Sequence, residues 1–367
     1  MIATFLHTAD IHLGVKLKNR GFSLSECEKR RLDIWDTFEN IIKIANEENI
    51  KYLLIAGDLI DQQYCNFKDM KKISLLFKKI NNTKVIITCG NKDPYSITCL
   101  YDYIKWPENV FIFKNTEDIS KFEFEEDNIC IYSLCWGEDN AADMEDEIYN
   151  LKVDSDKINI LLEHCSIDTE DNCPLTLDES IIKHKFDYCA LGHIHKYTVI
   201  ERNVIFPGTP EPFDYDYVNY EHGIIKGWIS KEDLKTEFVP ICNRRLISKK
   251  IVIKNDYDYN KILDSIRQVG ENINIMKDYV KIELAGTISN DISINEIKDA
   301  AKQFFYYIDF EDNYTYEKSV TESIGKLRGN IIENYITQFE KEDNQDKLYE
   351  KAFELGLQLL KNEGGVK

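Results

Sequence analysis

Side chains that bind metal ions recur at short intervals in the first two hundred residues of this 367-residue chain. They lie in five short motifs: Asp-x-His, Gly-Asp, Gly-Asn-x-Asp, a single histidine and Gly-His-x-His. The candidate ligands in these motifs are Asp10, His12, Asp58, Asn91, His164, His193 and His195. Oxygen and imidazole donors without thiolate suit borderline to hard first-row divalent ions such as manganese, iron or zinc. Each motif alone has an ordinary structural explanation, such as a turn at Gly-Asp, but the five together favour a metal site.

The number of candidate ligands predicts two metal ions. The expected first ion binds Asp10, His12 and His195, and the second binds Asn91, His164 and His193, with Asp58 bridging both. Two cations about 4 Å apart can activate a water molecule and stabilise the charge that develops on a phosphoryl group. The predicted chemistry is therefore hydrolysis of a phosphoester, and it needs no nucleophilic side chain.

Each motif directly follows a short apolar run that predicts a buried strand. The runs are residues 2–6, 52–56, 85–89, 158–162 and 188–191. Segments with helical spacing lie between strands, and the longest, residues 26–49, places Leu32, Trp35, Phe38, Ile41, Ile42 and Ala45 on one face. This alternation is typical of an α/β fold. In open α/β sheets the carboxyl ends of neighbouring strands lie at one edge, so the five motifs are expected to converge there.

Changes in composition divide the chain into three parts. Residues 1–243 carry all the candidate ligands and are predicted to form the catalytic domain. Residues 244–315 contain strands of alternating polar and apolar residues beside helical stretches, which predicts a small α+β domain. Residues 316–367 hold two amphipathic helix candidates and form the predicted helical tail.

Charge and composition limit the classes of function. With 46 basic and 65 acidic residues, a net charge of −19, the chain is not expected to bind nucleic acid tightly without help. Its apolar runs are far shorter than the roughly twenty residues that span a bilayer, so no membrane association is expected. The first residues show neither a basic segment nor a cleavage site of a signal peptide, and the ten cysteines form no Cys-x-x-Cys pair. Both observations favour a cytoplasmic protein.

The series of motifs resembles the calcineurin-like metallophosphoesterases and, more narrowly, the SbcD-type DNA repair nucleases. The narrower resemblance rests on HTADIHLG near the amino terminus and on PGTPEPFDYDYVNYEHG at 207–223. It implies a β-sandwich flanked by helices, with a small capping domain that contacts DNA. It also implies manganese as the preferred metal and exonuclease and endonuclease activity on DNA. The partners that it implies are a coiled-coil ATPase of the SbcC type, docked through the carboxyl-terminal helices, and a second copy bound through the catalytic domain.

The chain departs from this family at one catalytic position. The family motif is Gly-Asn-His-Asp, whose histidine lies beside the scissile phosphate and is oriented by the following acid; here these two positions are Lys92 and Asp93. A lysine brings positive charge, but with an ordinary pKa near 10.4 it is a poor proton donor at neutral pH. Burial beside two cations is expected to lower that pKa, so the predicted outcome is intact metal binding with weakened hydrolysis.

Two alternatives follow from the same residues. One is a phosphodiesterase that acts on a small nucleotide or a phosphoprotein. The other is a catalytically weakened scaffold that keeps its metal ions, and Lys92 is the feature that favours it. The full set of ligands argues against a purely structural protein, because clustered carboxylates and histidines are costly to bury without a function.

Overall fold

The computed structural model describes two compact units. The described residues are 2–17, 22–137, 144–167, 175–213, 215–218 and 220–316, together with 335, 338, 339, 352, 353, 355 and 356. One unit consists of Met1–Ser248, Asn274–Lys281 and Phe305–Tyr307, and the other of Lys249–Ile273, Ile282–Phe304 and Ile308–Lys367. The predicted helical tail at 316–367 lies almost wholly outside the described residues, so it stays a prediction.

The larger unit contains two six-stranded sheets. In the first, the strand order is β14-β13-β1-β2-β3-β4. Its strands are β1 (Ala3–Thr8), β2 (Tyr52–Ala56), β3 (Lys84–Thr88), β4 (Val110–Ile112), β13 (Gly223–Ile229) and β14 (Leu234–Pro240). Strands β1 to β4 run parallel, and β13 and β14 join them antiparallel. All five residues of β2 are buried, as expected for a parallel strand covered on both faces.

The second sheet has the order β11-β12-β10-β7-β6-β5. Its strands are β5 (Ser120–Phe124), β6 (Ile129–Ser133), β7 (Ile158–His164), β10 (Tyr188–Gly192), β11 (Thr198–Glu201) and β12 (Val204–Phe206). Successive residues of β6 enter different cores, since Ile129 and Ile131 belong to one apolar cluster and Cys130 and Tyr132 to another. This alternation follows from the two-residue period of a strand. Between β7 and β10 in the sequence, β8 (Ser166–Ile167) and β9 (Thr176–Leu177) form a separate, short parallel pair.

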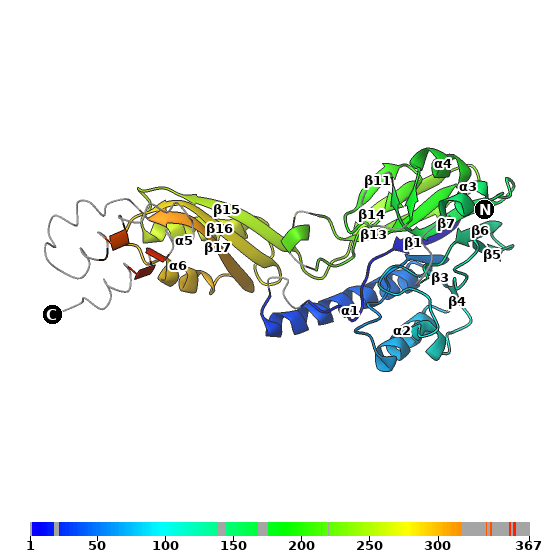
Figure 1. Cartoon of the computed structure of the whole chain (residues 1–367), viewed down its shortest axis with the longest axis horizontal. Coiled ribbons are helices and arrows are strands. Elements are labelled where there is room, and N and C mark those ends of the chain that lie inside the picture. Colours follow the sequence, from blue (N-terminus) through cyan, green and yellow to red (C-terminus); the bar gives the residue numbers. More distant parts are fainter. Residues whose placement is uncertain are drawn as a thin grey trace. The chain divides into compact units, whose positions relative to one another are not determined.

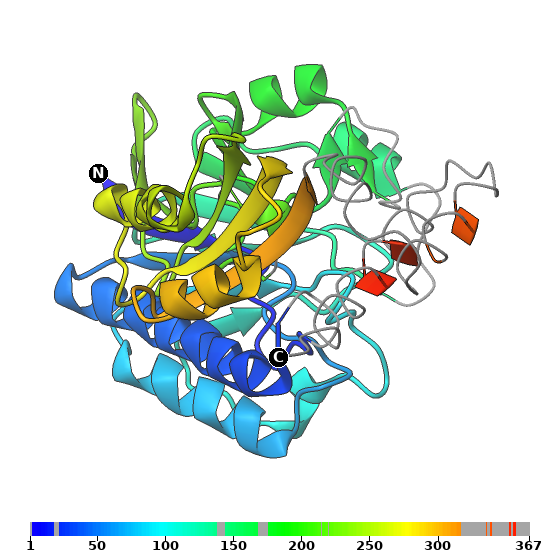
Figure 2. The same ribbon diagram turned by 90° about the vertical axis from the view of Figure 1, so that its left-hand side faces the viewer.

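The two sheets pack face to face and are covered by helices on their outer faces (Figures 1 and 2). Strands β2 and β3 contact β7, and β10 contacts β2. Helices α1 (Leu24–Glu47) and α2 (Phe67–Lys79) lie side by side along the first sheet, and α3 (Met144–Asn150) and α4 (Glu179–Lys185) lie by the second. The predicted α/β class and helix-flanked sandwich are confirmed. The strand ends therefore belong to two facing sheets rather than to one open sheet.

Helix α1 buries a polar stripe as well as an apolar one. Phe38 and Ile41 face the core as predicted, but the assignment of Leu32 to this face is wrong, because Leu32 is 65% exposed. Arg30 and Asp33, on either side of Leu32 in the sequence, are buried instead and form an ion pair of 2.8 Å. Ser23 caps the helix by accepting a hydrogen bond from the Glu26 amide.

The described part of the smaller unit contains two α-helices and most of one three-stranded sheet. Most residues of the three strands lie in this unit: β15 (Leu246–Ile253), β16 (Tyr279–Ile288) and β17 (Tyr307–Tyr316), in that order in the sheet. Helices α5 (Tyr259–Gln268) and α6 (Ile294–Ala301) contact each other and bury Ile262, Ile266, Ile294 and Ile297. The predicted contact of this segment with DNA stays a prediction.

Three short 3-10 helices complete the described elements. They are η1 (Leu100–Tyr103), η2 (Tyr215–Tyr217) and η3 (Val269–Asn272). Within the described part of the chain, every helix is too short or too polar to cross a membrane.

Candidate metal centre

The predicted ligands lie at the carboxyl ends of five strands in the larger unit. Asp10 and His12 follow β1, Asp58 follows β2, and Asn91 follows β3 in the first sheet. His164 ends β7, and His193 and His195 follow β10 in the second. Because β1, β2 and β3 are neighbours in one sheet and β7 and β10 in the other, packing of the sheets brings the two sets of side chains together.

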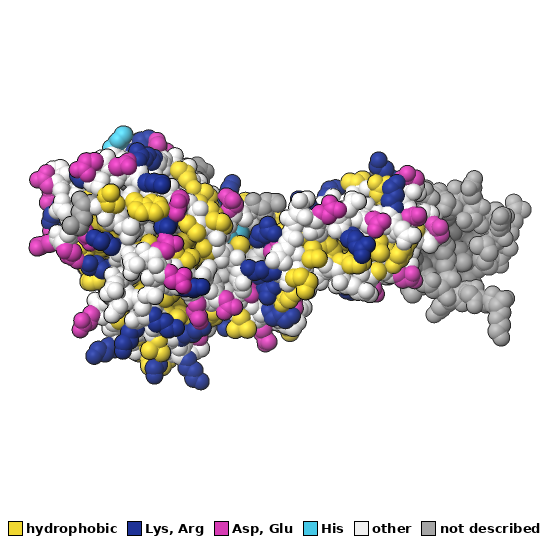
Figure 3. Space-filling view, turned by 180° about the vertical axis from the view of Figure 1, so that it is seen from behind, with side chains coloured by type: hydrophobic (Ala, Val, Ile, Leu, Met, Phe, Trp, Pro, Cys, Tyr) yellow, Lys and Arg dark blue, Asp and Glu magenta, His cyan; other side chains and the backbone are white. Residues whose placement is uncertain are grey.

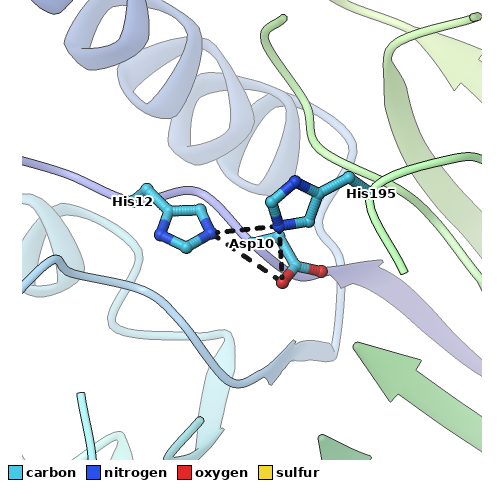
Figure 4. Close-up of side chains that lie close together, drawn as sticks. All are labelled: Asp10, His12 and His195. Atoms are coloured by element: carbon cyan, nitrogen blue, oxygen red, sulfur yellow. Dashed lines mark hydrogen bonds and ion pairs between the residues drawn. The ribbon is translucent and has the colours of Figure 1, made fainter. Parts of the chain in front are cut away.

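One group of donor atoms joins Asp10, His12 and His195 (Figure 4). The Nε2 atoms of the two histidines are 3.4 Å apart, and each faces the carboxylate of Asp10. Oδ1 of Asp10 lies 3.9 Å from Nε2 of His12 and 3.6 Å from Nε2 of His195. These are the three side chains expected for the first ion.

A second group of donor atoms joins Asp10, Asp58 and His164. Oδ2 of Asp58 lies 3.5 Å from Nε2 of His12 and 3.7 Å from Nε2 of His164, so it stands between the two groups. Oδ1 of Asn91 lies 3.1 Å from Nε2 of His164. This arrangement is compatible with the predicted bridging position of Asp58, and it gives Asp10 a place in both groups.

His193 is the predicted histidine ligand that these two groups leave out. Its ring lies beside that of His164, with centroids 5.3 Å apart. Its main-chain N–H donates to both carboxylate oxygens of Asp10, at 3.2 and 3.0 Å. The backbone of His193 therefore helps to orient Asp10 from the opposite sheet.

Backbone strain is concentrated at this centre. Six non-glycine residues have a positive φ in the described ranges, and four of them are Asp10, His12, Asp58 and His193, with φ of 52°, 51°, 51° and 101°. Such conformations cost of order 1–3 kcal/mol each and persist where the surrounding structure fixes them, which is characteristic of functional sites. The strain turns these side chains away from the sheet and toward one another.

Glycines allow the close approach of the ligand loops. A Cβ atom at Gly57, where φ is 80°, would lie 2.4 Å from Nδ1 of His164. A Cβ atom at Gly90 would lie 2.4 Å from Oδ1 of Asp58. The predicted Gly-Asp and Gly-Asn motifs thus need glycine for the packing of the ligands as well as for turns.

The centre holds buried charge in close proximity. Burial, and then the charge of Asp58, raises the pKa of Asp10 well above its ordinary value. Burial raises the pKa of Asp58 to about 7, and burial together with the charge of Asp58 raises the pKa of Asp93 to about 6. Burial also lowers the pKa of His164 to about 4, which keeps its imidazole neutral at pH 7. Carboxylates and neutral imidazoles that are buried together form a donor set that a cation stabilises.

The hydrogen bonds of His164 indicate a metal ligand. Its Nδ1 atom lies 3.0 Å from the carbonyl oxygen of Ala56, so Nδ1 carries the proton of the neutral ring. The lone pair of Nε2 then faces Oδ1 of Asn91, which is also an acceptor. A neutral imidazole nitrogen and an amide oxygen placed side by side are both ligands that a first-row divalent cation accepts. The residues present therefore fit divalent metal ions.

Asp93 acts through the backbone of the ligand loops. It is fully buried, and its carboxylate accepts hydrogen bonds from the amides of Asp58 (3.0 Å), Leu59 (3.0 Å) and Gly90 (2.7 Å) and from the Tyr101 hydroxyl (2.6 Å). These bonds tie the loop after β2 to the loop after β3. These contacts give Asp93 a positioning role in the ligand loops, and its predicted catalytic role stays a prediction.

Lys92 lies in the loop after β3 and is exposed to solvent. Its N–H donates to Oδ1 of Asp58 at 2.7 Å, and its carbonyl accepts from the amide of Gln62 at 3.0 Å. Its side chain is exposed, so the expected burial of Lys92 is wrong. The loop reaches Asp58 with its backbone and leaves the lysine side chain in solvent.

The sequence patterns gave no role to two aromatic residues at the centre. Phe213 is buried, and its ring meets those of His12 and His195 edge-on, at centroid distances of 5.1 and 5.7 Å. The hydroxyl of Tyr217 lies 3.2 Å from Nδ1 of His195. Both residues lie in the 207–223 motif, whose aromatic content was a possible signal, but only the fold places it against the histidines.

Comparisons with known proteins agree with this geometry. The chain is 28% identical over 221 residues to the uncharacterized metallophosphoesterase YhaO of Bacillus subtilis, covering 57% of this chain and 53% of that protein. It is 31% identical over 210 residues to the DNA double-strand break repair protein Mre11 of Methanocaldococcus jannaschii, covering 54% and 52%. The chain thus spans about half the length of these two relatives.

A further relative matches nearly the whole chain at lower identity. The Mre11 protein of Sulfurisphaera tokodaii is 22% identical over 358 residues, which cover 91% of this chain and 87% of that protein. The model of the calcineurin-like phosphoesterase family matches residues 3–197, the range that carries all seven predicted ligands. This chain belongs to the calcineurin-like phosphoesterase family of metal-dependent hydrolases.

Proposed function

We propose that this chain is a metal-dependent DNA nuclease, with exonuclease and endonuclease activity, that works in a complex of the SbcCD type. The observation that carries the proposal is the convergence of two donor groups that share Asp10, with Asp58 between them. One site is formed by Asp10, His12 and His195 and the other by Asn91, His164 and the neighbouring His193, with Asp58 shared by both. When bound there, two divalent ions supply an activated water and neutralise charge on a phosphodiester.

The protein residues have separate roles in this mechanism. Asp58 holds the two sites at a fixed separation, and its own Oδ1 is fixed by the amide of Lys92. Asp93 and Asp10 are held by backbone amides, so the carboxylates are oriented before substrate binds. This preorganisation means that little rearrangement accompanies the reaction. We further propose manganese as the metal, on the basis of the resemblance to SbcD-type nucleases.

The proposed DNA substrate rests on the relatives of the chain, and its charge bears on how that DNA is held. Relatives that are named as DNA double-strand break repair proteins match this chain over as much as 91% of its length. The net charge of −19 disfavours strong contacts with a phosphate backbone. Figure 3 shows acidic and basic side chains interspersed on one face of the protein. We therefore propose that an ATPase partner of the SbcC type provides most contacts with DNA.

A specific observation favours a second version of this function. The exposed side chain of Lys92 stands at the position where the family motif has a histidine. A lysine there supplies charge to a phosphoryl oxygen but transfers a proton poorly at neutral pH. The second candidate is therefore a subunit that binds metal and DNA ends, with its own hydrolysis weakened.

The test is manganese-dependent cleavage of linear and hairpin DNA by the purified chain, with Asp58→Asn as the control for contaminating nuclease. Cleavage by the native protein and its loss in Asp58→Asn support the nuclease. Cleavage by Lys92→His alone supports the weakened subunit. Hydrolysis of bis(p-nitrophenyl) phosphate without any cleavage of DNA would favour the small-molecule phosphodiesterase and overturn the proposal. A tight, salt-sensitive affinity of the isolated chain for DNA would overturn the proposed need for a partner.

A further inference from the structure

The imidazole of His195 is held differently from that of His164. Nδ1 of His164 lies 3.0 Å from a main-chain carbonyl, that of Ala56, on a ring with no exposed surface. Nδ1 of His195 lies 3.2 Å from a side-chain hydroxyl, that of Tyr217, on a ring that is 24% exposed. A main-chain carbonyl only accepts hydrogen bonds, whereas a phenol hydroxyl both donates and accepts them. The position of the hydroxyl depends on the tyrosine side chain alone, which a substitution can change. The orientation of His195 therefore depends on Tyr217 in a way that a point mutation can remove.

The direction of this hydrogen bond follows from the position of the other ring nitrogen. Nε2 of His195 faces Oδ1 of Asp10 at 3.6 Å and Nε2 of His12 at 3.4 Å (Figure 4). A histidine that binds a metal through Nε2 carries its proton on Nδ1. Nδ1 of His195 then donates to the oxygen of Tyr217, which fixes both the tautomer and the ring angle.

The segment around Tyr217 is itself fixed against His195. The amide of Thr209 donates to the carbonyl of His195 at 3.1 Å. His222 is buried; its Nδ1 lies 3.0 Å from the carbonyl of Thr209, and its Nε2 lies 3.4 Å from the carbonyl of Tyr217. A closed circuit of contacts thus runs from His195 through Thr209, His222 and Tyr217 back to the His195 ring.

A buried ion-pair network anchors the same segment to the body of the unit. Glu211 accepts hydrogen bonds from Arg30 and from the Thr37 hydroxyl, both at 2.8 Å, and all three side chains are buried. Phe213, two residues further on, packs edge-on against His12 and His195. Described residues on both sides of Tyr217, namely Glu211, Phe213 and His222, are therefore held in place.

We propose that Tyr217 is a positioning residue that orients His195 and so sets the affinity of one of the two metal sites, the one formed with Asp10 and His12. The inference rests on the metal-binding part of the proposed function and not on cleavage of DNA. Outer partners of metal-binding histidines typically contribute 10- to 100-fold to metal affinity. Loss of the Tyr217 hydroxyl is expected to weaken this site alone, because the ring of His164 keeps its main-chain partner.

The test is calorimetric titration of Mn²⁺ into metal-free native protein, Tyr217→Phe and Tyr220→Phe. Tyr220 is a matched control because it lies in the same segment and its ring contacts Lys196 at 5.2 Å and the ring of Tyr217 at 6.0 Å. The native protein and Tyr220→Phe are each expected to bind two ions. The affinity of each binding step is expected to be the same in Tyr220→Phe as in the native protein. In Tyr217→Phe one binding step is expected to weaken about tenfold while the other stays unchanged.

A double-mutant cycle identifies the site that is affected. His195→Asn is expected to remove the step that Tyr217→Phe weakens, and adding Tyr217→Phe to it should cause no further loss. Native affinities in Tyr217→Phe, equal weakening of both steps, or failure of the variant to fold would each overturn the inference. If the native protein itself binds no Mn²⁺, the proposed function fails as well. If it binds two ions and Tyr217→Phe binds them equally well, only the role of Tyr217 is wrong.

Discussion

The carbonyl oxygen of Ala56 accepts a hydrogen bond of 3.0 Å from Nδ1 of His164 across the interface between the two sheets. Ala56 ends β2 in the first sheet, and His164 ends β7 in the second. The same carbonyl excludes a side chain from β10, since a Cβ atom at Gly192 would lie 1.8 Å from it. One backbone group therefore orients a predicted metal ligand and sets the distance between the sheets at the centre.

Gly192→Ala is expected to lower the free energy of unfolding by about 1–3 kcal/mol or more, because the added methyl overlaps the Ala56 carbonyl and contacts the Cβ of Ala9 at 2.9 Å. Relief of this overlap requires β10 to move away from β2, so Mn²⁺ affinity is expected to fall as well. Denaturant unfolding and metal titration measure both effects. A variant within about 0.5 kcal/mol of the native protein would contradict the close approach.

Asp93→Asn is expected to destabilise the protein by about 2–4 kcal/mol and to weaken metal binding. Both oxygens of Asp93 accept hydrogen bonds from backbone N–H groups. In asparagine an NH₂ group replaces one of these oxygens, so it would face N–H donors and those hydrogen bonds would be lost. Relief of repulsion with Asp58 offsets part of this loss. Tyr101→Phe, which removes a single hydrogen bond of 2.6 Å to Asp93, is the milder comparison. Equal stability of native protein and Asp93→Asn would show that the loops are held by other contacts.

Lys92→His is expected to increase manganese-dependent cleavage of DNA, by at most the 100- to 10,000-fold that general acid catalysis contributes. Because an ordinary histidine has a pKa near 6.5, the gain should decline as the pH rises above 7. Lys92→Ala separates the charge of the lysine from its chemistry, and its activity should fall below that of the native protein. Rates of single-turnover cleavage between pH 6 and 9 test this. A histidine variant no faster than the native protein would mean that Lys92 already fulfils the family role.

Glu163→Gln is expected to make the protein more stable at alkaline pH than the native chain. Glu163 is fully buried beside His164, and burial raises its pKa to about 8, whereas its unfolded value is near 4.5. The folded state therefore holds this proton more tightly, so native stability falls as the pH rises from about 4.5 to about 8. The loss from this group is about 3 kcal/mol at pH 7. Urea unfolding of both metal-free proteins at pH 5 and pH 8 measures the difference, and equal pH slopes would contradict a buried neutral carboxyl at position 163.

The sequence by itself determined which side chains are available for metal binding and where they stand along the chain. The end of a strand is a local feature of the sequence. The apolar run 52–56 forms a buried strand, and the next two residues along the chain are Gly57 and Asp58. The prediction of Asp10, His12 and His195 as one set needed only the order of strands and ligand chemistry. The ten cysteines and the net charge favoured a cytoplasmic protein that does not bind DNA tightly on its own, and both expectations stay predictions.

Only the tertiary structure decided how the strand ends meet and which residues support them. The ligands converge because two sheets face each other, and long-range packing of β2 against β7 and β10 has no local sequence signal. The directions of side chains after a strand depend on strained φ values and on distant hydrogen bonds, as for Asp93, whose carboxylate turns inward to backbone amides. The pairing of His195 with Tyr217, 22 residues later, likewise exists only because the chain returns to the centre after β12.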